Sequence, residues 1–60
     1  MTFSEQVKSE RQRLGLSQAE LARVLNVSFE AISKWERGLV MPAEIAQEGA
    51  LARLRKMKKP

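Results

Sequence analysis

The sequence has 60 residues, with 11 Lys and Arg against 7 Asp and Glu, and it contains neither cysteine nor histidine. This composition excludes a disulfide framework and a His/Cys metal site, so we expect neither a metal nor a cofactor. A chain this short buries only about 60% of its unfolded surface, so a partner is expected to add stability. The formal net charge of +4 favours a polyanionic partner.

The same composition argues against an enzyme and against a membrane protein. Without His, Cys, Asp or Tyr, only a Glu or Lys with a strongly shifted pKa could serve as acid or base near neutral pH, so no catalytic residue is expected. An apolar run such as Leu39–Met41 is far shorter than the roughly 18 residues of a membrane span. Residues 1–5 contain no apolar signal-peptide region, which predicts a cytoplasmic protein.

The first predicted helix covers residues 4–14, with Ser4 as its N-cap and Gly15 as its stop. The prediction follows from apolar residues that recur at helical intervals between charged positions. These residues are Phe3, Val7 and Leu14.

Two shorter helices are predicted next. Ser17 and Glu20 have the spacing of a capping box, which starts a second helix that Asn26 can end in a left-handed conformation. A third helix covers residues 28–37, opens on an N-cap serine and ends at Gly38. The connection between the two is about three residues long, which forces them to cross steeply, as in a helix-turn-helix.

A fourth helix is predicted over about residues 42–57, with Pro42 in its first turn and Gly49 weakening its middle. The chain has no strand-like alternation and no linker, so we expect one all-α domain over residues 1–60, with a helix-turn-helix core at about 17–38. The predicted core of the helix-turn-helix consists of Leu16, Leu21, Ala22, Leu25, Val27, Ile32 and Trp35.

Three sequence segments, GLSQAELA, NVS and ISKWERG, follow one another between residues 15 and 38, within a matching stretch of about residues 7–42. In order and spacing they resemble the helix-turn-helix family of phage repressors and Cro proteins, also called Xre-like or lambda repressor-like. The resemblance implies a compact domain of four to five helices. It also implies a sequence-specific transcriptional regulator, most simply a repressor that binds double-stranded DNA as a homodimer on a palindromic operator, and hence a nucleoid-associated location.

The outward face of the third helix is the candidate base-reading surface. The resemblance places base contacts at Phe29, Glu30 and Lys34, with Ser33 nearby. Lys34 could donate to guanine, Glu30 could accept from cytosine, and Phe29 could pack on a thymine methyl. Two plainer interpretations stay open: Glu30 and Lys34 form only a surface ion pair, and Phe29 lies buried beneath a loop.

Phosphate contacts are expected at Gln18 and Ser28, at the N-termini of the second and third helices, where the helix dipole attracts anions. Ser28 could instead act purely as a cap. Arg37, at the end of the third helix, is a further candidate. The family pattern also pairs Arg11 with Glu36, and this ion pair could orient Arg11 toward phosphate or be only an exposed salt bridge.

Beyond Gly38 the resemblance weakens, so the dimer surface is less defined. Its candidates are apolar residues that either contact a second copy or complete the core within one chain: Leu39, Val40, Met41, Leu51 and Leu54.

The end of the chain carries basic residues without an acid among them: Arg53, Arg55, Lys56, Lys58 and Lys59. They contact phosphate, or they form a solvated helix end that the dipole favours.

The alternative to a DNA-binding repressor is an antitoxin-like module, in which the apolar loop and the last helix bind a protein partner.

Overall fold

A computed structural model of the chain describes residues 1–58 and places four helices and no strand in that part. These helices are α1 (Phe3–Arg13), α2 (Gln18–Leu25), α3 (Phe29–Glu36) and α4 (Glu44–Lys56). The predicted all-α class is confirmed. Lys59, the last of the predicted tail residues, lies outside the described residues.

Helix α1 begins earlier than predicted, because Thr2 and not Ser4 is its N-cap. The Thr2 hydroxyl accepts a hydrogen bond from the Glu5 backbone N–H at 3.2 Å, and the Glu5 carboxylate accepts one from the Thr2 N–H at 3.0 Å. This reciprocal pair is a capping box, which satisfies two helix-end donors at once. Ser4 therefore lies inside the first turn. Gly15 has a φ of 68°, which confirms it as the stop.

The caps of α2 and α3 are confirmed. Ser17 and Glu20 form a second capping box, with bonds of 3.1 and 2.8 Å. Asn26 ends α2 with a φ of 57°, in the left-handed region. The Ser28 hydroxyl accepts from the Ala31 N–H at 3.0 Å, and Gly38 follows α3 with a φ of 73°. Each helix of the pair therefore starts and stops on signals within its own sequence.

Helix α4 begins at Glu44, so the prediction that Pro42 occupies its first turn is wrong. Ala43, the N-cap residue, has an extended ψ of 152° and forms no side-chain cap bond. Pro42 lies ahead of the helix, where its carbonyl accepts a hydrogen bond from Gln47 Nε2 at 2.9 Å. That bond ties the loop to the first turns of α4.

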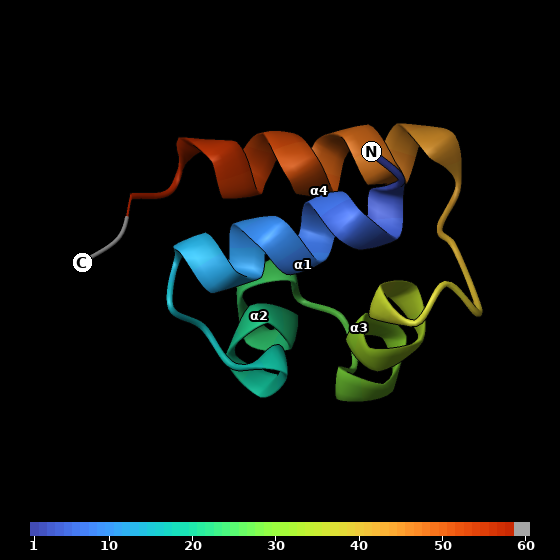
Figure 1. The fold of residues 1–60 in the computed structure, drawn as a ribbon, viewed down its shortest axis with the longest axis horizontal. Coiled ribbons are helices and arrows are strands. Elements are labelled where there is room, and N and C mark those ends of the chain that lie inside the picture. The colour runs from blue at the N-terminus through green and yellow to red at the C-terminus, as the bar shows by residue number, and fades with distance from the viewer. Residues whose placement is uncertain (59–60) are drawn as a thin grey trace.

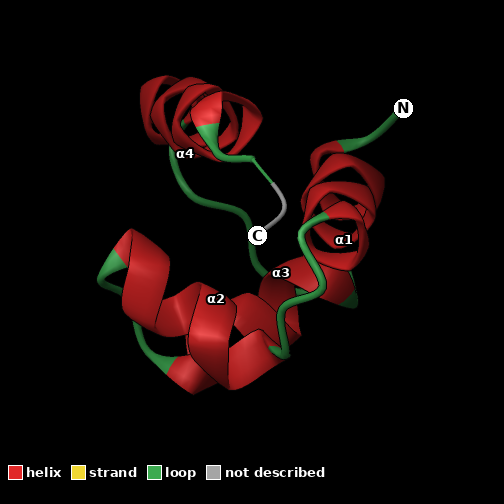
Figure 2. Cartoon of the chain, turned by 90° about the vertical axis from the view of Figure 1, so that its left-hand side faces the viewer, coloured by secondary structure: helices red, strands yellow, loops and turns green. Residues whose placement is uncertain are grey.

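Figures 1 and 2 show α4 at one side of the molecule and the α2–α3 pair at the other. Helix α1 packs against both α3 and α4, while α2 packs against α3. Between them lies a core to which all four helices contribute, and in which the rings of Phe3 and Trp35 meet edge to face with centroids 5.6 Å apart. The buried residues are Phe3, Val7, Leu14, Leu21, Ala22, Ile32, Trp35, Leu51 and Leu54.

Most of the predicted core residues of the helix-turn-helix are buried. Leu16, Leu25 and Val27 are only partly buried and pack against the edge of the core. Trp35 is the largest side chain in the core, and its removal should cost about 3 to 5 kcal/mol of unfolding free energy.

Candidate nucleic-acid interface

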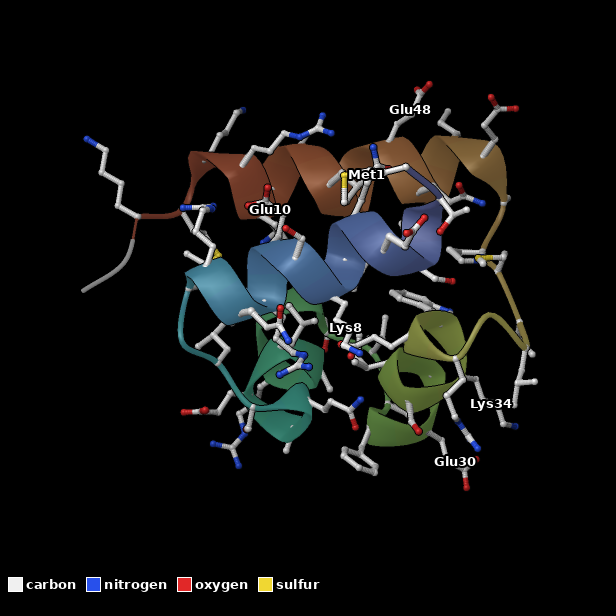
Figure 3. The ribbon with its side chains drawn as sticks, in the orientation of Figure 1. Met1, Lys8, Glu10, Glu30, Lys34 and Glu48 are labelled. Carbon is white, nitrogen blue, oxygen red and sulfur yellow. The ribbon has the colours of Figure 1, made fainter. Side chains whose placement is uncertain are left out.

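Helix α3 has one buried face and one exposed face. Ile32 and Trp35 point into the core. Glu30 and Lys34 come from the other side of the helix, and Figure 3 shows them pointing outward, away from α4. Phe29 comes from the exposed flank between the two faces. A helix of this kind, presenting polar groups and one aromatic ring on its free side, has the shape that the DNA major groove admits.

Phe29 is 54% exposed, so it does not lie beneath a loop. An aromatic ring that is half exposed to water gains favourable free energy when a partner buries its apolar surface. Lys34 Nζ and Glu30 Oε2 are 3.9 Å apart, which is a long i, i+4 ion pair between exposed side chains. Such a pair contributes only about 0.2 to 0.5 kcal/mol, so either group can leave it for another partner at small cost.

The N-termini of α2 and α3 hold the two predicted phosphate-contact residues other than the arginines. Ser28 is exposed, and its hydroxyl already accepts the capping bond from Ala31, which leaves its O–H free to donate. Gln18 is the first residue of α2, and the positive end of that helix dipole lies beside it. The geometry therefore accommodates a cap role and an anion contact together at Ser28.

Arg11, Gln18 and Glu36 form one hydrogen-bonded network that joins α1, α2 and α3. Arg11 Nε and Nη2 donate to the two carboxylate oxygens of Glu36 at 2.7 and 3.0 Å, and Arg11 Nη1 donates to the Leu16 carbonyl at 3.0 Å. Gln18 Nε2 also donates to Glu36, at 3.2 Å. The predicted pairing of Arg11 with Glu36 is present and is bidentate, the strongest geometry for such a pair.

This network is too enclosed to be only an exposed salt bridge. The side chains of Arg11 and Glu36 are 17% and 4% exposed. Three of the five guanidinium N–H groups of Arg11 are already engaged within the chain. Its main role in this structure is to hold Glu36, which in turn fixes the amide of Gln18.

Arg37 lies at the end of α3 and is exposed. Its Nε donates to the carbonyl of Ser33 at 3.4 Å, and Ser33 itself is half-buried. The guanidinium thus stays at the C-terminal end of the helix, where a positive charge complements the dipole. It remains available to solvent or to an anion beside the helix.

The predicted dimer candidates divide into two groups. Leu51 and Leu54 are buried in the chain's own core, so they complete that core and are corrected as candidates. They pack inward because they share one face of α4, on the side that docks on α1. The loop residues are exposed, and together with Ile45, which is 80% exposed, they form what we term the loop patch: Leu39, Val40, Met41 and Ile45.

Ile45 is a candidate that the sequence interpretation missed. Its signal was available, because Ile45 lies nine positions before Leu54, which at 3.6 residues per turn places it on the side of α4 opposite that buried leucine. Arg13 was also missed: its Nη2 donates to the Leu54 carbonyl at 2.9 Å and its Nη1 to the Met57 carbonyl at 3.3 Å. It therefore caps the end of α4 from α1.

Within residues 1–58, no three acidic, histidine or cysteine side chains come together as metal ligands, and no pocket is present. Across the same residues, every helix is too short or too polar to span a membrane.

A short helix pair with a three-residue turn and an outward α3 face defines a helix-turn-helix DNA-binding domain. The family pattern described as helix-turn-helix matches residues 7–45, well over half of the chain. The chain belongs to the Xre/Cro-like helix-turn-helix family, and it is a DNA-binding regulator in that general sense. Comparison with curated proteins and with solved structures gives no match.

Proposed function

We propose that this chain is a sequence-specific transcriptional repressor that reads a palindromic operator through the major groove. The observation that carries the proposal is the exposed surface of α3, where Glu30 and Lys34 lie away from the buried Ile32 and Trp35 and Phe29 is 54% exposed. The chain acts in the cytoplasm on the nucleoid and needs no cofactor.

In this mechanism α3 lies in the major groove with its N-terminal half against the bases. Lys34 donates to guanine, Glu30 accepts from cytosine N4, Phe29 packs on a thymine methyl, and Ser33 lies nearby. Separating Lys34 from Glu30 costs little because their ion pair is long and exposed. The hydrogen bonds to bases therefore contribute more binding free energy than the loss of the Lys34–Glu30 ion pair costs.

Phosphates are bound beside the groove, and these contacts position α3 without reading sequence. Gln18 and Ser28 bind them at the helix N-termini, and Arg37 binds one at the end of α3. The carboxylate of Glu36, held by Arg11, fixes the side chain of Gln18 at 3.2 Å before DNA arrives. Arg11 has two N–H groups left to donate, so it can contribute a phosphate contact from its exposed edge.

The proposed homodimer uses the loop patch, whose four side chains are exposed on each copy. A two-fold dimer of helix-turn-helix domains binds half-sites about 34 Å apart, one turn of the duplex. Bound across a promoter, the dimer blocks polymerase. Because three of the four patch residues lie in the loop that follows α3, the dimer contact and the groove contact come from neighbouring segments.

Selection of bound duplexes from a random pool at physiological salt tests the proposal. The expected result is an enriched motif with two inverted half-sites, centred one helical turn apart. Failure to enrich any motif would overturn sequence-specific regulation. A single half-site without its inverted repeat would retain readout by α3 and overturn the homodimer.

Two variants separate base reading from positioning. Lys34→Ala should relax preference at one position, at a cost of about 1 to 3 kcal/mol in binding free energy, whereas Gln18→Ala should weaken all sites alike. Lys8→Ala is the matched control, because it removes an exposed lysine of α1 and changes the net charge as Lys34→Ala does. Uniform loss with Lys34→Ala would contradict its base-reading role.

The second candidate function is an antitoxin-like module, which the loop patch favours because exposed apolar side chains also suit a protein partner. In that case Ile45→Glu should abolish capture of a stoichiometric partner protein and leave the selected DNA motif unchanged. Homodimer operation predicts the opposite: the same variant should lose binding to the full palindrome and keep binding to a half-site.

A further inference from the structure

The positive charge of the molecule is concentrated at the C-terminal end of α4. Residues 1–37 carry six basic and five acidic side chains, which nearly balance. Helix α4 has its acids in its first half, at Glu44 and Glu48. From residue 49 to residue 58 there are four basic side chains and no acid: Arg53, Arg55, Lys56 and Lys58, which we term the basic end.

The basic end lies far from the candidate base-reading face. In Figure 1 the last turns of α4 occupy the corner diagonally opposite α3, and Figure 2 also shows α4 above the α2–α3 pair. Figure 3 shows Glu30 and Lys34 at the side of the molecule away from α4. A duplex bound along α3 therefore does not bring its phosphates to the basic end.

All four side chains are exposed, and among the described residues none pairs with a carboxylate. The segment that carries them also lacks an apolar anchor, since no large exposed hydrophobic side chain falls between residues 49 and 58. Protein interfaces depend on buried aromatic or aliphatic anchors, and helices that lie in a membrane surface need an apolar face. Long, flexible basic side chains alone suit a phosphate backbone.

We propose that the basic end binds the phosphate backbone of a second DNA duplex, so that one molecule bridges two DNA segments. The inference rests on α3 as the first DNA contact. Contact through the basic end is independent of sequence, because phosphates carry no base information. Its strength therefore depends on salt, falling as counterions compete for the same phosphates.

The test uses the full chain, a duplex of random sequence fixed on beads and a second, labelled duplex in solution. Protein loaded on the beads measures the first contact, and retained label measures bridging. The wild type should retain label in proportion to loaded protein. Arg53→Gln/Arg55→Gln/Lys56→Gln/Lys58→Gln should still load on the beads through α3, while the label retained per loaded protein falls by about tenfold or more, because four phosphate contacts are lost.

Charge-conserving Arg53→Lys/Arg55→Lys is the matched control and should bridge like the wild type. Lys56→Gln/Lys58→Gln changes only the last residue of α4 and a residue beyond it, so it tests the surface without risk to the core. It should give an intermediate loss of bridging, with an unchanged thermal melt.

Three results would overturn the inference. Unchanged bridging by the fourfold variant would leave these charges as compensation for the dipole of α4. Loading and bridging that fall by the same factor would place the basic end on the duplex already bound by α3. Normal loading without bridging by the wild type would assign the basic end to another partner, such as an acidic protein, while leaving the proposed function intact.

Discussion

Ser4, which the sequence predicts as the N-cap of α1, instead lies inside the first turn of that helix with a buried hydroxyl. Its hydroxyl oxygen is the sole side-chain polar atom among residues 1–58 that is buried without a hydrogen-bond partner. It lies against Gly38, 3.5 Å from where a Cβ on that glycine would stand. An unpaired buried hydroxyl loses its hydration without compensation, which costs about 1 to 3 kcal/mol.

Ser4→Ala should therefore stabilise the protein, by about 1 kcal/mol in the free energy of unfolding measured by urea denaturation. Ser9→Ala is the matched control, because Ser9 is an exposed serine in the same helix and reports the gain in helix propensity alone. Equal gains from the two substitutions would show that the buried hydroxyl carries no penalty.

At the scale of single elements, the helix ends explain which predictions succeeded. Ser17, Asn26, Ser28 and Gly38 were correctly assigned because each cap depends only on residues within about four positions. The Thr2 cap was equally visible in the sequence, as Thr-x-x-Glu, and was overlooked. This error is therefore one of interpretation, because the sequence contains the capping signal.

Other features are not encoded locally. Whether Leu51 and Leu54 face the core or a second copy depends on how α4 docks on α1, which brings together residues more than thirty positions apart. The Arg13 cap on α4 is of the same kind. Pro42 fits a first helical turn by its fixed φ, yet the loop bond from Gln47 holds it ahead of the helix.

Gly15 and Gly49 both have open space where a side chain would stand, so they make a matched pair for testing the effect of backbone conformation. A Cβ added to Gly49 or Gly15 would meet nothing within 4 Å, but Gly49 is helical whereas Gly15 has a φ of +68°. Gly49→Ala should stabilise the fold by about 1 kcal/mol through helix propensity, and Gly15→Ala should destabilise it by about 1 kcal/mol or more. Thermal and urea unfolding measure both, and a loss of stability in Gly49→Ala would contradict this account of α4.

The two capping boxes make helix stability depend on pH. Hydrogen bonds from the backbone N–H and the hydroxyl of the cap residue, Thr2 for Glu5 and Ser17 for Glu20, lower the pKa of each carboxyl from its ordinary value of 4.5. A lowered folded-state pKa means that the stabilisation is complete above the unfolded pKa and is lost as the pH falls through the folded one. Acid should therefore weaken α1 and α2 together.

The midpoint temperature of thermal unfolding should fall as the pH is lowered from about 5 to about 2. Glu20→Gln should reduce that fall, because a neutral amide can still accept the cap bond and does not titrate. Glu48→Gln, which removes an exposed carboxyl from α4, should retain the full pH dependence. A wild-type slope in Glu20→Gln would show that its capping box does not contribute to acid sensitivity.

At the scale of the whole molecule, the Arg11–Glu36–Gln18 network links folding to recognition. It joins α1 to the ends of α2 and α3, the two helices that form the candidate DNA interface. Because the carboxylate of Glu36 is nearly buried, it depends on Arg11 for its charge balance. The orientation of the interface is thus fixed by the same bonds that attach α1 to the helix pair.

Arg11→Met should destabilise the fold by about 2 to 3 kcal/mol, somewhat less than a fully buried broken pair, because Arg11 keeps 17% of its side chain exposed. Arg11→Met/Glu36→Leu should recover part of that loss, since no unpaired carboxylate remains. Urea denaturation of both variants, with Arg23→Met as an exposed control on α2, measures the coupling. If the double variant were less stable than Arg11→Met, the main contribution of the pair would be packing and not charge. At temperatures where it is folded, Arg11→Met should also weaken binding to all DNA sequences alike. Arg11 then no longer holds Glu36, the acceptor of the Gln18 amide, while α3 keeps its base-reading side chains.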